Sequence, residues 1–139
     1  MSEAEQLFGD EHTRRYRETD GEVGHIWWRG SKILLLTTKG RKSGEPRTTP
    51  LIYEEADGDY VVVASKGGAP EHPGWYRNLA NEPEVELQVK NEVFPARART
   101  ATGVERERLW KLAARQWPDY DEYQTRTDRE IPVVVLERQ

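Results

Sequence analysis

The sequence predicts a mainly β fold (α+β), a small barrel of about six mostly antiparallel strands with helices on its outside. Short runs rich in branched and aromatic residues follow one another at hairpin spacing through residues 32–65 and again through 84–100. A long amphipathic helical pattern appears only late in the chain, before a final valine-rich run. The connections between the first three predicted strands are too short for the crossover helices of a parallel sheet.

The first predicted elements lead into two hairpins. Residues 3–19 fit a polar helix, and residues 25–30 ("HIWWRG") form a short aromatic element. The apolar run 32–38 ("KILLLTT") predicts a buried strand, and 47–55 ("RTTPLIYEE") predicts the strand that returns beside it. An Asp-Gly pair within 56–59 then predicts a tight turn into a third strand, "YVVVAS".

A short helix and another hairpin come next. Residues 72–84 predict a helix that begins near Pro73, the position where proline best starts a helix. Residues 84–90 alternate apolar and polar side chains, and 92–100 return after a very short turn. These two segments therefore predict an antiparallel pair.

The last third of the sequence predicts two helices and a closing strand. Thr102 and Glu105 have the spacing of a capping box ahead of a helix that Pro118 ends. A further short helix is expected within 119–130, and "IPVVVLER" at 131–138 closes the chain as a strand.

Composition narrows the functional classes. The 139 residues suit one domain, and 25 acidic against 21 basic residues give a net charge of −4. This charge argues against a nucleic-acid partner that covers the whole surface. There is no cysteine, no run approaching the ~18 apolar residues of a membrane span and no signal peptide, so a cytoplasmic protein is expected. The three histidines, His12, His25 and His72, lack ligand spacing, and no metal site or nucleophilic triad is predicted.

Two basic, glycine-rich turns are candidate anion sites. In "KGRKSGEPR" (39–47) the backbone can curl at Gly40 and Gly44 while Lys42 and Arg47 converge, which suits a phosphate or carboxylate. "ASKGGAPEHPGWYRNL" (64–79) leaves a strand through glycines and enters a helix, and helix-start amides also suit anions. Taken alone, each turn is equally compatible with an ordinary solvated connection.

Trp117, Tyr120 and Tyr123 form an aromatic cluster near the end of the chain. The two tyrosines are spaced i, i+3, so they share a helix face, and core packing is the default explanation. Single-stranded nucleic acid could bind a barrel with aromatics, but basic residues do not alternate with aromatics along any predicted strand. From the residues alone, the prediction is a small barrel with an anion-binding edge.

Three motifs together resemble a known family. "LLLTTKGRKSGEPRTTPL", "VVVASKGGAPEHPGWYRNL" and "YDEYQTRTDREIPVVVLE" are similar, in order and spacing, to the deazaflavin (coenzyme F420)-dependent nitroreductase family of actinobacterial oxidoreductases. The resemblance covers about residues 33–137. It implies a split β-barrel similar to flavin-reductase and pyridoxamine-phosphate-oxidase-like barrels, with 30–139 as the deazaflavin-binding domain and 1–29 as a variable segment, helical or mobile.

The resemblance also implies a cofactor site. The basic turn would hold the phosphate and oligoglutamate tail of F420, and the segments after it would line the deazaflavin ring. The cofactor-binding positions implied are Arg41, Lys42, Ser43, Arg47, Thr48, Thr49, Pro50, Leu51, Ile52, Val63, Ala64, Ser65, Lys66, Gly74, Trp75, Tyr76, Arg77 and Asn78.

On the substrate side, the resemblance implies that Ser65, Tyr120 and Tyr123 act in catalysis and, with Trp117, bind the acceptor. Trp117 stands where the best-known nitroreductase has a tyrosine, which changes the shape of the pocket. The implied reaction is hydride transfer from reduced F420 to an electron-poor small molecule, a quinone, activated enone or nitroaromatic.

Two alternatives remain open at this point: the same barrel binding FMN, or a carrier of F420 or another amphipathic ligand without turnover. The polyanionic tail of F420 accounts for more cations than the single phosphate of FMN needs. A monomer or homodimer is expected, and peripheral contact with a membrane surface is left open.

Overall fold

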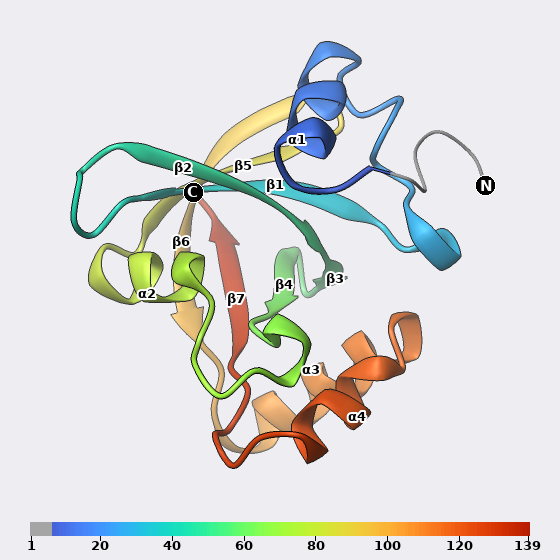
Figure 1. The fold of residues 1–139 in the computed structure, drawn as a ribbon, viewed down its shortest axis with the longest axis vertical. Helices are drawn as coiled ribbons and strands as arrows, with labels where there is room; N and C mark the ends of the chain where they lie inside the picture. The colour runs from blue at the N-terminus through green and yellow to red at the C-terminus, as the bar shows by residue number, and fades with distance from the viewer. Residues whose placement is uncertain (1–6) are drawn as a thin grey trace.

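The computed structural model describes residues 7–139 (Figure 1). The helices are α1 (Gly9–Glu18), α2 (Gly74–Asn81), α3 (Gly103–Gln116) and α4 (Asp119–Thr125), with the 3₁₀ turns η2 (Trp28–Gly30) and η3 (Lys66–Gly68). The strands are β1 (Ile33–Lys39), β2 (Pro46–Ile52), β3 (Glu54–Ala56), β4 (Asp59–Val63), β5 (Glu84–Val89), β6 (Glu92–Thr100) and β7 (Val133–Arg138).

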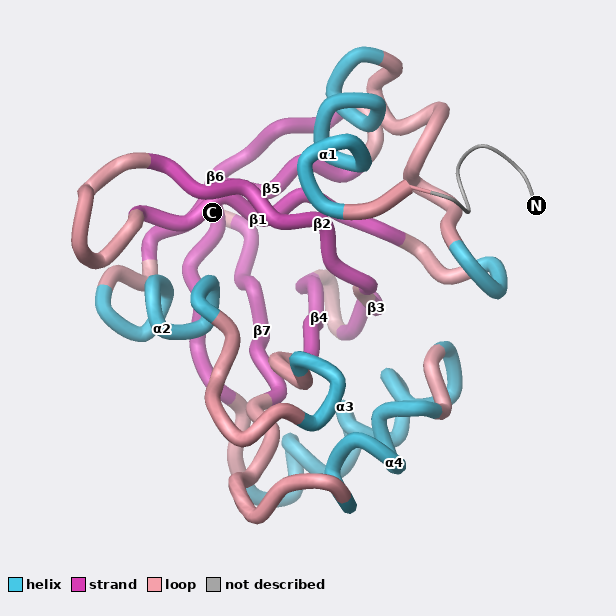
Figure 2. Tube along the Cα trace, viewed as in Figure 1, coloured by secondary structure: helices cyan, strands magenta, loops and turns pink. Residues whose placement is uncertain are grey.

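The strands form one antiparallel sheet in the order β2-β1-β5-β6-β7-β4-β3. Figure 2 shows how the sheet bends, with β1, β2 and β5 crossing the top of the view while β7 and β4 run downward. The two edge strands, β2 and β3, are consecutive in the chain and are joined through Tyr53. The sheet therefore curls into a half-closed barrel, which confirms the predicted antiparallel fold.

The number of strands differs from the expected six because the predicted strand 47–55 is divided. Its first part, β2, pairs with β1, whereas its second part, β3, pairs with β4. Tyr53 lies at the break, where its backbone N–H donates to the carbonyl of Lys32 (3.0 Å). The Asp-Gly turn after β3 forms as predicted, since both Asp57 and Gly58 have positive φ (56° and 85°).

The core lies inside the curled sheet, and a second apolar layer lies outside β1. Leu34 and Leu36 point into the barrel with Leu87, Val134 and Leu136. The alternate residues of β1, Ile33 and Leu35, pack against Tyr16 of α1 instead. Burial on both faces explains why β1 reads as a continuous apolar run rather than an alternating strand.

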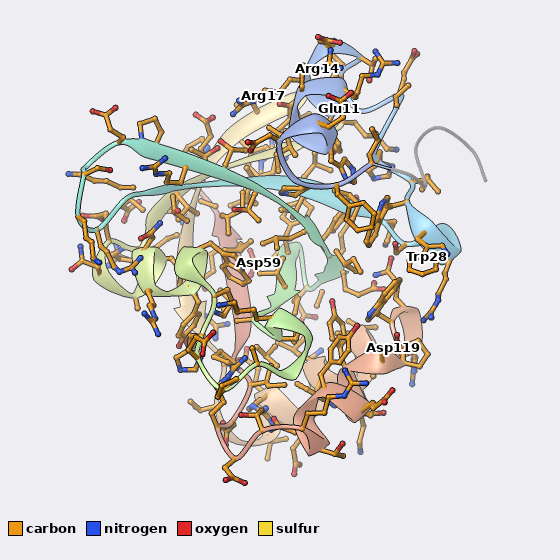
Figure 3. All side chains as sticks on the ribbon, viewed as in Figure 1. Glu11, Arg14, Arg17, Trp28, Asp59 and Asp119 are labelled. Carbon is orange, nitrogen blue, oxygen red and sulfur yellow. The ribbon has the colours of Figure 1, made fainter. Side chains whose placement is uncertain are left out.

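Helix α1 is attached to the barrel by a buried tyrosine. Tyr16 is fully buried, and its hydroxyl donates to the carbonyl of Ile33 (3.0 Å) while accepting from the N–H of Lys90 (2.7 Å). Glu11, Arg14 and Arg17 lie on the outer side of the helix (Figure 3). The first residues of the predicted helix 3–19 lie outside the described part, and the boundary at residues 29/30 stays a prediction.

Two local predictions near α3 need correction. Thr102 is the N-cap residue of α3, but its side chain makes no capping hydrogen bond, so the predicted capping box is wrong. Arg99 of the preceding strand binds the carboxylate of Glu105 instead, through two hydrogen bonds of 2.6 and 2.9 Å. The helix expected within 119–130 ends earlier, at Thr125.

The helix predicted within 72–84 is confirmed as α2, with Trp75 and Leu79 buried on one face. Among residues 7–139, no helix is both long and apolar enough to cross a bilayer.

Candidate functional site

A cavity of about 340 Å³ opens where α1, β2, β4, η3, α2 and α4 approach one another. Its walls are mostly apolar and aromatic. Ser65 follows the end of β4, and Trp117 precedes α4, so the cavity joins segments that are distant in sequence. Pockets of this kind, with few polar groups on an apolar wall, are typical of cofactor and substrate sites.

All four positions expected to bind the acceptor line this cavity: Ser65, Trp117, Tyr120 and Tyr123. The aromatic members contact one another. The Trp117 indole N–H donates to the Tyr123 hydroxyl (3.3 Å), and the rings of Tyr120 and Tyr123 meet edge to face at 6.2 Å. Trp117 and Tyr120 are buried and belong to one apolar cluster with Val63 and Ile131. Trp117 and Tyr120 therefore pack in the core, as aromatic residues at helical spacing usually do, and also line the cavity.

Two residues that line the cavity, Ser65 and Tyr120, carry hydroxyl groups that are available to a ligand. Burial, and after it the neighbouring Tyr123 and Glu54, raise the pKa of Tyr120, so its phenol stays protonated at neutral pH. Within residues 7–139, neither the Tyr120 hydroxyl nor the Ser65 hydroxyl has a hydrogen-bond partner. Each is free to bond a ligand oxygen.

The expected cofactor positions divide into two groups. Those that line the cavity are Pro50, Leu51, Ile52, Val63, Ser65, Lys66 and Trp75. Those that lie off it are Arg41, Lys42, Ser43, Arg47, Thr48, Thr49, Ala64, Gly74, Tyr76, Arg77 and Asn78. The first group would contact a ring in the cavity. The second group lies on the turn between β1 and β2, on β2 and on α2, apart from Ala64, which follows β4.

The basic turn between β1 and β2 is fastened to α2 through Asn78. The Asn78 amide oxygen accepts from both the backbone N–H (3.2 Å) and the guanidinium (2.9 Å) of Arg41, and its NH₂ group donates to Thr38 (3.1 Å). Asn78 is buried, so its amide is engaged by the protein itself. Ser43 is likewise occupied, since its hydroxyl accepts from the N–H of Glu45 (3.1 Å). These two positions shape the turn.

A set of unpaired cations, which we call the cation cluster, surrounds this turn and α2: Lys39, Arg41, Lys42, Arg47 and Arg77. Within the described residues, none of the five forms an ion pair. Several arginines elsewhere on the surface are paired with carboxylates, as Arg108 is with Asp57 (3.0 Å). Cations that form no ion pair within the protein favour an anionic ligand.

Sequence reasoning missed the wall of the cavity that the N-terminal segment provides. Leu7, Phe8, Gly9, His12 and Trp27 line it, as do Ile33, Gly67 and Pro73. The only available signal was the aromatic element "HIWWRG", whose partners lie far away in the sequence.

Trp27 stacks on Trp117 with ring centroids 5.9 Å apart and an interplanar angle of 18°. Beside this pair, Arg29 bonds Asp119 (3.2 Å) and lies over the Trp117 ring at 4.7 Å. Figure 3 shows Trp28 above Asp119 at the same edge of the molecule. The aromatic element thus joins the N-terminal segment to the start of α4 and closes one side of the cavity.

His12 is a buried, neutral member of the cavity wall. Its Nε2–H donates to the carbonyl of Gly24 (2.8 Å), and burial lowers its pKa. In the part of the chain that the structure describes, no group of three or more His, Asp or Glu side chains could hold a metal ion.

Comparisons with known proteins identify the family to which the chain belongs. The model of the F420H(2)-dependent quinone reductase family matches residues 9–138. An F420H(2)-dependent quinone reductase of Mycobacterium tuberculosis is 44% identical over 131 residues, which cover 91% of this chain and 87% of that protein. The solved structure of an F420-H2 dependent reductase, FDR-A, is 51% identical with a TM-score of 0.70, covering 76% of this chain and 93% of that one.

More distant structures share the fold alone. A pyridoxamine 5′-phosphate oxidase-like structure from Listeria innocua is 10% identical with a TM-score of 0.54, covering 77% of this chain and 83% of that one. These likenesses confirm the split-barrel fold, and the family match extends over α1 as well as the barrel. The chain belongs to the F420H(2)-dependent quinone reductase family.

Proposed function

We propose that this protein is an oxidoreductase that transfers a hydride from reduced F420 to a quinone-type acceptor in the cavity. The observation that carries the proposal is the pairing of an aromatic cavity with the cation cluster beside it. Family membership supports both the cofactor and the acceptor class.

The residues present fit the cofactor. A flat apolar ring suits the cavity wall made by Pro50, Leu51, Ile52 and Trp75. The five unpaired cations suit a phosphate followed by several carboxylates, because each anionic group finds a charged donor. When bound, reduced F420 supplies the hydride, while the protein provides binding, orientation and exclusion of water.

The acceptor would lie against the aromatic wall. Trp117 and Tyr123 offer ring faces and edges on which a planar quinone packs. As the hydride arrives, negative charge develops on a quinone oxygen, and the free hydroxyls of Ser65 and Tyr120 can donate hydrogen bonds to it. The proton that completes the hydroquinone comes from solvent or one of these hydroxyls, and the Trp27 wall limits the entry of water.

The same cavity admits other electron-poor planar molecules. We include activated enones and nitroaromatics as further acceptors, because an aromatic wall with two hydroxyls discriminates weakly among them. The proposal also places the protein in the cytoplasm, as a monomer or homodimer with membrane contact only at its periphery. A solved relative at 48% identity and TM-score 0.73, covering 91% of this chain and 95% of that one, is described as a domain-swapped dimer, which supports the homodimer.

Cofactor choice and turnover are tested separately. Titrating the purified protein with F420 or FMN while following tryptophan quenching should show binding of F420 and little of FMN. Tight FMN binding without F420 binding would overturn the proposal. Mixing the protein with reduced F420 and a panel of quinones, enones and nitroaromatics should reoxidise the cofactor, fastest with quinones. Binding without reoxidation by any acceptor would favour the carrier alternative instead.

A further inference from the structure

We propose that Arg129 is a positioning residue that fixes the Ser65 loop, residues 64–69, in the shape that presents Ser65 to the cavity. The inference rests on the proposed function, since it concerns how the acceptor side of that site is held. Arg129 lies between α4 and β7 and does not line the cavity itself. It acts through the loop's backbone.

The guanidinium of Arg129 donates hydrogen bonds to four acceptors. Its Nη2 donates to the carbonyl of Ser65 (2.8 Å), its Nε to the carbonyl of Ala69 (2.9 Å), and its Nη1 to the carbonyl of Ala64 (3.2 Å). The same Nη1 also reaches Nδ1 of His72 (3.1 Å). One side chain therefore bonds the beginning and the end of the loop and the segment that leads to α2.

Among residues 7–139, Arg129 forms no ion pair with a carboxylate, and its bonds go to backbone carbonyls and a histidine ring instead. Burial lowers the pKa of Arg129, because partial removal from water disfavours its charged form. Only arginine offers five N–H donors in a planar fork, so lysine could satisfy fewer of these acceptors and could not hold them in one plane.

The loop requires such support because its backbone is strained. Lys66, Gly67 and Gly68 are consecutive residues with positive φ (46°, 62° and 85°). A non-glycine residue in this region costs about 1–3 kcal/mol and persists only where its surroundings hold it. Inside the loop, the hydrogen bonds from Gly68 to Ser65 (2.9 Å) and from Ala69 to Lys66 (3.1 Å) depend on this conformation.

The loop also sets the position of α4. A Cβ added at Gly68 would lie 2.6 Å from the backbone oxygen of Tyr123, so the loop and the helix are in direct contact. A change in the loop is thus passed to Tyr120 and Tyr123. The cation cluster lies elsewhere, on the turn between β1 and β2, its flanking strands and α2. Arg129 is expected to control the acceptor side of the site and not the binding of the cofactor tail.

The test compares Arg129→Lys and Arg129→Gln with Arg108→Lys, a control that alters an exposed arginine paired with Asp57 far from the cavity. Amide hydrogen exchange is followed at Gly68 and Ala69, together with the Kd for F420 and the kcat/KM for a soluble quinone. Added guanidinium ion is tested for rescue of an Arg129→Ala variant.

Both Arg129 variants should lose amide protection at Gly68 and Ala69. We expect kcat/KM for the quinone to fall about 100-fold, the scale of a roughly 1 Å displacement at a reacting centre, with guanidinium restoring part of it. The Kd for F420 should stay within about threefold, since these variants keep the cations that bind the tail. Unchanged amide protection in both variants, or equal losses in Arg108→Lys, would overturn the inference. If wild-type protein showed no turnover, the exchange measurement would still decide whether Arg129 fixes the loop.

Discussion

Replacing Tyr16 by phenylalanine should detach α1 from the barrel without leaving a large cavity. The substitution removes only the hydroxyl, which donates to the carbonyl of Ile33 and accepts from the N–H of Lys90. Each lost hydrogen bond is worth about 1 kcal/mol, and a buried group left without a partner adds to that cost. We therefore expect a loss of about 2 kcal/mol in the free energy of unfolding. For a chain of this length, that corresponds to a Tm lower by roughly 6–8 °C.

Urea denaturation, followed by tryptophan fluorescence, measures the loss directly. Tyr76→Phe is a matched control, since it removes a hydroxyl whose hydrogen bond to Thr100 is exposed, and it should cost less than about 0.5 kcal/mol. Because α1 carries His12 and Gly9 to the cavity, Tyr16→Phe should also raise the KM for the quinone. Equal stability losses in the two variants would refute the argument that Tyr16 anchors the N-terminal segment.

Three further predictions concern charge, pocket shape and pH. The double variant Lys42→Ser/Arg47→Ser should bind F420 more weakly than the wild type, with the largest difference at low salt, where charges are least screened. Calorimetric titration at two salt concentrations measures this difference. Unchanged affinity would count against the cation cluster as the binding site of the F420 tail. Trp117→Ala should break the stack on Trp27 and raise the KM for quinones, with little effect on F420 binding. Steady-state kinetics separates these two effects. A selective loss of F420 binding would contradict this prediction. Burial lowers the pKa of His12 and His25 below 6.5, so the unfolded chain binds more protons and stability should fall as the pH drops from about 6.5 toward the folded pKa values. Urea titrations across this pH range should show that the free energy of unfolding falls less steeply in His12→Gln than in the wild type. A wild-type stability that did not change with pH would contradict this prediction.

The sequence was sufficient to predict the structural features that depend on short-range residue patterns. The Asp-Gly turn, the alternating strand β5 and the helix between Pro73 and Pro83 all follow from neighbouring residues, and each forms as expected. The break at Tyr53 does not follow from such patterns, because β2 and β3 form one continuous strand-like run. Contacts far along the chain fix it: the Tyr53 hydroxyl bonds His25 (2.8 Å), and its carbonyl accepts from Gln116 (2.8 Å).

The candidate site was predicted only in part, again because some of its contacts join segments that are far apart in the sequence. The four acceptor-side positions line one cavity, as the resemblance implied, and the structure adds that α4 and the Ser65 loop are in contact there. The wall from the N-terminal segment was missed because the stack of Trp27 on Trp117 joins regions with no shared pattern. The capping box failed because Arg99, on a neighbouring strand, bonds the Glu105 carboxylate. In each case a tertiary contact outweighed a local preference.

A single-turnover experiment tests the central claim most directly. Excess protein is loaded with reduced F420 that carries deuterium or hydrogen at the reactive carbon, and is then mixed anaerobically with a soluble quinone. Reoxidation should be much faster than in a protein-free mixture, and it should be slower with deuterium, because the protein holds the donor and acceptor in position for hydride transfer. Reoxidation no faster than in the protein-free mixture would contradict the assignment of this cavity as a quinone reductase site.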